Sequence, residues 1–91
     1  MDLELRMDVH ICLGPSTRNR EKAQNSMSID NLYRSLDFTD SEIHLESAPS
    51  NHSPSPYDFI YKGLLELDAR HLAHEIQNQL EGFYAKAVKR K

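Results

Sequence analysis

The sequence predicts a small α+β fold in which a β-α-β unit is packed by a helical C-terminal half. From residue 3 to residue 13 apolar and polar side chains alternate strictly, with the period of a β-strand. Between residues 57 and 89 the apolar residues instead recur every three or four positions, with the period of an α-helix. The 91 residues suffice for one small domain spanning 1–91.

The β-α-β unit is predicted from three successive patterns. A first strand covers about 2–13, a short helix covers about 28–37, and renewed alternation predicts a second strand at 42–47. A crossover helix between two strands makes them parallel and the connection right-handed. An alternative interpretation pairs Leu36 and Phe38 with Ile43 and Leu45 as a hairpin.

Two segments lack a periodic pattern. Residues 14–27 begin with Gly14-Pro15 and continue with polar and basic residues, which predicts a polar loop. Residues 48–56 contain three prolines among serines, which predicts an extended linker inside the domain.

The C-terminal half carries two apolar stripes that point in different directions. Ile60, Leu64 and Leu67 share the first stripe, and the second follows after Asp68. Asp68 is a suitable N-cap, which predicts two helices of about 57–67 and 69–88. The alternative is one long helix over about 57–89 whose stripes face different partners.

Composition and charge narrow the functional classes. Of the 91 residues 38% are hydrophobic and 27% charged, no apolar run is long enough to span a membrane, and no secretory signal is recognisable. The lone Cys12 suits a reducing compartment, so we expect the cytoplasm. Residues 27–81 hold ten acidic and three basic residues, whereas the last ten hold four basic and none acidic. An acidic body argues against a domain that lies wholly on nucleic acid.

No motif predicts catalysis, a cofactor or a metal. His71 and His74 have a spacing that metal sites use, but no third ligand stands at a telling distance. Cys12 and His10 lack an orienting group, and Gly14-Pro15 lacks the glycines and the lysine of a phosphate loop. We therefore expect a protein that is not an enzyme.

The surplus of apolar helical residues predicts a protein-interaction module. A two-stranded sheet has little area to bury the second stripe, so part of it is expected to meet a partner protein or a second copy. The expected partner-binding residues are Leu72, Ile76, Leu80, Phe83 and Tyr84. In the competing interpretation, the helices mainly cover one another. A nucleic-acid-associated regulator is the functional alternative, with anion contacts from Arg18, Arg20, Lys22, Lys89 and Arg90.

The order of elements also resembles a known family. The short helix carries Asp30-Asn31-Leu32-Tyr33-Arg34-Ser35-Leu36, and the second strand region carries Glu42-Ile43-His44-Leu45-Glu46-Ser47-Ala48-Pro49. With the Pro/Ser linker and the Leu-rich end, this layout resembles the small effector-associated adaptor domains of bacterial conflict systems. The resemblance implies an adaptor that tethers an effector to its regulator, although Leu67-Asp68-Ala69 replaces the glycine-rich break usual in that family.

Overall fold

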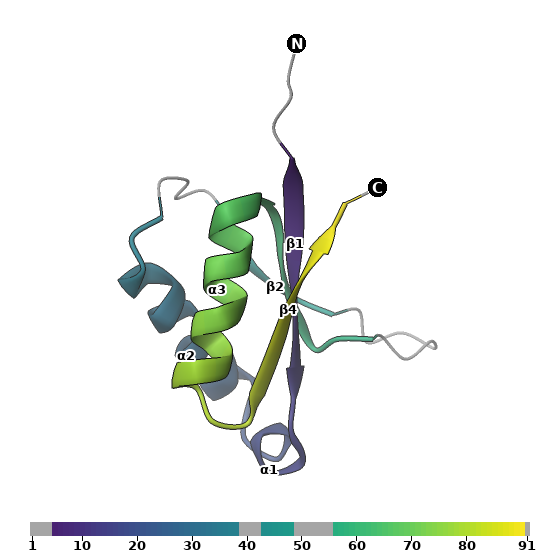
Figure 1. Ribbon diagram of the computed structural model, residues 1–91. Coiled ribbons are helices and arrows are strands. Elements are labelled where there is room, and N and C mark those ends of the chain that lie inside the picture. Colours follow the sequence, from purple (N-terminus) through teal and green to yellow (C-terminus); the bar gives the residue numbers. More distant parts are fainter. Residues whose placement is uncertain (1–4, 39–42, 49–55, 91) are drawn as a thin grey trace.

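The computed structural model describes residues 5–38, 43–48 and 56–90. Within these ranges the chain forms four strands and three helices (Figure 1). In chain order they are β1 (Arg6–Leu13), α1 (Pro15–Arg18), α2 (Lys22–Ser35), β2 (Leu45–Ser47), β3 (Phe59–Leu65), α3 (Glu66–Gln79) and β4 (Phe83–Lys89). None of the helices in the described ranges is both long and apolar enough to span a membrane.

The strands form one antiparallel sheet in the order β2-β3-β1-β4. Both β1 and β2 are antiparallel to β3, so they run in the same direction with β3 between them. This is the split β-α-β arrangement of ferredoxin-like topologies. The α+β class is confirmed. The direct pairing of the two predicted strands is wrong, because a strand from the C-terminal half is inserted between them.

The core lies on one face of the sheet, beneath α2 and α3 (Figure 1). On β1 the alternation predicted from the sequence is confirmed, since Met7, Val9 and Ile11 are buried and the residues between them are not. The strand begins at Arg6, and residues 2–4 of the predicted strand lie outside the described residues. The helices contribute apolar side chains such as Ile29 and Leu72 to the same core.

Residues 59–65 form β3, where a helix was expected. A β-bulge places Lys62 and Gly63 opposite Asp8, and Gly63 adopts a φ of 75° there. The extra residue shifts the alternation, so Tyr61 and Leu64 both reach the core although they are three positions apart. The bulge thus breaks the alternation that marks a strand, and Ile60 and Leu64, which lie on opposite faces of the sheet, have a four-residue spacing that imitates a helix. The expected stripe does not exist, because Leu67 is 81% exposed.

Residues 83–89 form β4, and the predicted helix is confirmed only in the middle of 57–89, as α3. Gly82, with a φ of 87°, lies in the turn between α3 and β4. In β4 Phe83 and Ala85 are buried, whereas Tyr84 and Lys86 are exposed, as expected for a strand with one covered face. Neither the helical pair nor the single long helix is correct.

The predicted polar loop at 14–27 is instead α1 followed by the start of α2. Pro15 occupies the first turn of α1, where its missing N–H costs nothing. Asn25 is buried and its Nδ2 donates to the carbonyl oxygen of Thr17 at 3.0 Å. Asn25, Ile29 and Leu32 lie on one helical stripe, so the buried face of α2 starts with a polar residue. A search for apolar residues therefore misses the first turns of α2, which begins at Lys22 and not at about residue 28.

The second predicted strand is shorter than expected. Of residues 42–47, β2 takes 45–47 and pairs with β3, while residue 42 lies outside the described residues. Leu36 and Phe38 are not in a strand, and they pack against the core, so the alternative hairpin is wrong. Most of the predicted linker, residues 49–55, lies outside the described residues.

Candidate functional site

Most residues of the predicted partner-binding stripe belong to the core. Leu72 and Ile76 are fully buried, Phe83 is almost so, and Leu80 is half-buried against the same cluster. Of the five, Tyr84 is the large exposed side chain, with 57% of its surface accessible. The expected helical binding face is therefore wrong, because a four-stranded sheet buries the stripe that a two-stranded sheet could not.

The predicted anion contacts do not form one patch. Arg18 donates to the carbonyl oxygen of Leu13 at 3.1 Å and to the Asp58 carboxylate at 3.0 Å. Arg20 and Lys22 are exposed between α1 and the first turn of α2, beyond the Leu13 end of β1, whereas Lys89 ends β4 beside Met7 and Arg90 follows it. Figure 1 shows α1 and the C-terminus at opposite ends of the sheet. The basic residues are therefore separated by the length of β4.

The histidines and the cysteine identified in the sequence take part in local contacts. His74 Nε2 lies 2.7 Å from Asn78 Nδ2, and His71 Nε2 lies 3.7 Å from the Glu75 carboxylate. The Cys12 thiol donates to the carbonyl oxygen of Pro56 at 3.3 Å. Across the described part of the chain, no three His, Cys, Asp or Glu side chains are grouped as a metal site requires.

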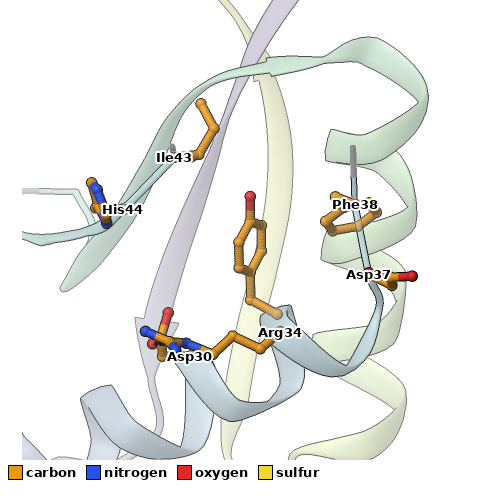
Figure 2. Close-up of a pocket in the computed structure, with 7 residues that line it drawn as sticks. Asp30, Arg34, Asp37, Phe38, Ile43 and His44 are labelled. Atoms are coloured by element: carbon orange, nitrogen blue, oxygen red, sulfur yellow. Dashed lines mark hydrogen bonds and ion pairs between the residues drawn. The ribbon is translucent and has the colours of Figure 1, made fainter. Parts of the chain in front are cut away.

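A cavity of about 250 Å³ lies between the last turns of α2 and the segment leading into β2 (Figure 2). Its lining consists of Asp30, Tyr33, Arg34, Asp37, Phe38, Ile43 and His44. Figure 2 shows Asp30 and Arg34 together on α2, with Ile43 and His44 across from Phe38.

The polar groups of this cavity are engaged in holding α2 against β3. The Tyr61 hydroxyl donates to one Asp30 oxygen at 3.0 Å, and Arg34 Nε donates to the other at 2.9 Å. Tyr33 stacks on Tyr61 with ring centroids 4.6 Å apart. Burial, followed by the nearby Asp30 carboxylate, raises the pKa of Tyr61 far above its ordinary value of 10.0. Tyr61 therefore stays protonated, and this network is structural.

Asp37 ends α2 in the left-handed conformation, with a φ of 54°. Its N–H bonds to the Arg34 carbonyl oxygen at 3.3 Å. Aspartate tolerates this conformation better than most residues, and helices commonly end in this way. The positive φ is thus explained by the helix end and needs no catalytic role.

The face of the sheet opposite α2 and α3 is not covered by these helices, and it carries both charged and apolar side chains. We define the open face by the residues that alternate with the core residues, namely Arg6, Asp8, His10, Cys12, Ile60, Lys62, Tyr84, Lys86 and Val88. The strand register places Cys12 beside Tyr84, and His10 between Ile60 and Lys86. The alternation of β1 already predicted the β1 members, whereas those from β3 and β4 were missed with their strands.

The centre of the open face is aromatic and apolar. The His10 ring lies against Tyr57 with centroids 4.4 Å apart. Ile60 is only 4% exposed although it is not part of the helix-covered core. Burial, together with the Lys86 cation, lowers the pKa of His10 below 6.5, and Asp8 opposes this shift only in part. His10 is thus neutral at pH 7 and contributes an aromatic surface.

Charged residues surround this centre. Asp8 accepts a hydrogen bond from the Gly63 N–H at 2.9 Å and pairs with Arg90 at 3.4 Å. Lys62 pairs with Glu46 of β2 at 3.5 Å. Lys86 is exposed and has no ion-pair partner within the described residues. The open face therefore combines an aromatic centre, a charged rim and one unmatched cation.

Comparison of the chain with known proteins found no matching family model, no similar curated protein and no similar solved structure. The resemblance to conflict-system adaptor domains stays a prediction. The ferredoxin-like topology does not decide the function either, since that arrangement supports many unrelated activities.

Proposed function

We propose that this protein is a non-enzymatic interaction module that binds a partner protein through the open face of its sheet. The observation that carries the proposal is the exposed Tyr84 ring and the half-buried His10 ring, which is the register partner of the buried Ile60, within a charged rim. Protein interfaces have this anatomy, with apolar and aromatic residues at the centre and polar residues around them. Tyrosine and arginine are also enriched among the residues that dominate binding energy.

The charge of the open face favours an acidic partner surface. Asp8 and Glu46 are already paired with cations, whereas Lys86 has no carboxylate partner within the described residues. A carboxylate of the partner could therefore form an ion pair with Lys86, on the same face of β4 as the exposed Tyr84 ring. Adaptor, inhibitor and regulatory subunit are the roles that fit such a module, and the free thiol of Cys12 is compatible with the cytoplasm.

The first test identifies a partner and measures where it binds. A photo-reactive phenylalanine analogue at position 84 captures neighbouring proteins in the native host, and each captured protein is then purified and titrated. Truncating a central tyrosine typically costs an interface about 2 kcal/mol, so Tyr84→Ala is expected to weaken binding by roughly thirtyfold. Met27→Ala is the matched control, because Met27 is an exposed apolar side chain on α2.

The proposal is overturned if the purified partner binds Tyr84→Ala as tightly as it binds the unmodified protein. Single-stranded RNA added to the same titration decides the alternative: RNA binding that weakens steeply with salt and is lost in Tyr84→Ala would assign the open face to nucleic acid. Light scattering at micromolar concentration decides self-association, since a dimer that Tyr84→Ala dissociates would make a second copy the partner.

A further inference from the structure

The outer edge of β4 has no strand beside it in the described part of the chain. Bonds from Gly14 N–H to Gly82 O at 2.8 Å and from Arg90 N–H to Arg6 O at 3.5 Å bracket its pairing with β1. In an antiparallel pair the residues alternate in direction, so positions 82, 84, 86, 88 and 90 turn their backbone groups to β1. The backbone N–H and C=O groups of Ala85, Ala87 and Lys89 consequently point outward.

This edge is the longer of the two edges of the sheet. β4 has seven residues, contains no proline and pairs with β1 without a bulge, whereas β2 at the other edge has three residues. At ~3.4 Å per residue the β4 edge extends for about 24 Å. An exposed edge of this kind is a template for another strand.

The side chains flanking the edge differ between its two sides. On the open side of β4 stand Tyr84, Lys86 and Val88, and on the helix side stand the small Ala85 and Ala87, followed by Lys89. β4 itself contains no acidic residue. An incoming strand that alternates carboxylates with apolar residues would place a carboxylate beside Lys86 and its apolar side chains beside the alanines.

A hollow of about 290 Å³ lies at the middle of this strand. It is lined by His10, Cys12, Gln77, Tyr84, Ala85 and Lys86, so it includes residues from both sides of β4. A side chain of the added strand can occupy it. A second copy is a poor occupant, because pairing β4 with β4 brings Lys86 and Lys89 of both chains together.

We propose that β4 accepts an extended acidic segment of the partner protein as a fifth strand. This inference rests on the proposed function and names the part of the partner that is recognised. Main-chain hydrogen bonds at Ala85, Ala87 and Lys89 would supply much of the affinity, and the alternating side chains would supply the specificity.

The probe is the capped peptide acetyl-Glu-Val-Glu-Thr-Glu-Val-Glu-amide, titrated into the ¹⁵N-labelled full chain. Hydrogen exchange at the amides of Ala85, Ala87 and Lys89 is expected to slow by about tenfold or more when the peptide is bound. The amides of Leu45–Ser47 report on the β2 edge and are expected to stay unchanged. A peptide with lysine at the glutamate positions, and one with proline replacing threonine, are expected not to bind.

Charge reversal tests the specificity. Lys86→Glu is expected to weaken peptide binding by about tenfold, whereas Lys62→Glu, on the same face but away from the edge, changes it less than about twofold. Both lysines are exposed, so both variants are expected to fold, and urea unfolding checks that they do.

Failure of strand addition is distinguishable from failure of the proposed function. If the acidic peptide does not bind at millimolar concentration, binds without protecting the three β4 amides, or is matched by the lysine peptide, strand addition is wrong. The proposed function is judged separately, by the effect of Tyr84→Ala on the purified partner.

Discussion

Along β1, Val9 and Ile11 are fully buried beneath the helices, whereas their neighbours His10 and Cys12 are half-buried on the open face. The same contrast continues on β4, where Ala85 is buried and Tyr84 is exposed. Adjacent residues of one strand thus belong to two different environments. We expect the residues on the helix side to contribute most of the folding free energy, and those on the open face to contribute the free energy of binding a partner.

The contacts of the two faces support this division. The helix side consists of close-packed apolar side chains, whose burial is the main favourable contribution to folding. The open face is held by partly exposed ion pairs such as Asp8–Arg90 and Glu46–Lys62. Exposed ion pairs of this type contribute roughly 0–1 kcal/mol each. Substitutions on the open face can therefore change binding without unfolding the protein.

The largest difference is expected between Leu72→Ala and Val88→Ala. Leu72 is fully buried in the core, so its truncation should lower the free energy of unfolding by about 2–5 kcal/mol. Val88 is half-buried on the open face, and its truncation should cost less than about 1 kcal/mol. Urea unfolding followed by circular dichroism measures both. Equal losses in the two variants would show that the open face is also part of the folded core.

A smaller contrast is expected between two glycines at the end of the sheet near α1. A Cβ at Gly82 would collide with the buried Thr17 Oγ1, and the φ of 87° is itself unfavourable for alanine. Gly82→Ala is therefore expected to cost about 1–3 kcal/mol. At Gly14 the nearest atoms would lie 3.4 Å from a Cβ, which is an ordinary contact distance. The φ of Gly14 is negative, so alanine can adopt the same backbone conformation. Gly14→Ala should change stability by less than about 1 kcal/mol.

Thermal and urea unfolding of the two glycine variants provide the comparison. A Gly82→Ala protein as stable as Gly14→Ala would mean that Thr17 and the α3–β4 turn move apart without cost. The packing of α1 against this turn would then be looser than the structure indicates.

Elements with a regular apolar pattern were predicted, and elements with an irregular one were missed. β1 was predicted because its alternation is unbroken over the whole strand. β3 was missed because the bulge at Gly63 breaks its alternation, which left the four-residue spacing of Ile60 and Leu64 to be interpreted as helical. The start of α2 was missed because Asn25, a polar residue, occupies the first buried position of its stripe. A bulge or a buried polar residue is stabilised by contacts with residues distant in sequence, so the apolar period of one segment does not predict it.

The candidate site could be predicted only in part for the same reason. Counting two strands instead of four made Leu72 and Ile76 appear to exceed the available core, and both proved buried. Tyr84 is the exposed member of the five selected residues, but it was selected from a helical pattern that does not exist. The β1 half of the open face followed from alternation, whereas the β4 edge required the sheet order, which depends on contacts distant in sequence.

The smallest expected effect concerns the protonation of His10 at the centre of the open face. Burial, with Lys86 adding to it, holds the pKa of His10 below 6.5, so the unfolded chain binds a proton more readily than the folded one. His10 therefore contributes stability that is present above pH 6.5 and is lost as the pH falls from there towards the lowered pKa. A His10→Gln variant should lose less stability than the unmodified protein between pH 7 and this acidic range.

In Lys86→Gln the removal of the cation should raise the pKa of His10, which proton NMR of the imidazole ring measures directly. If His10 titrates at or above 6.5 in the folded protein, the ring is more hydrated than its contact with Tyr57 implies, and the open face loses its aromatic centre.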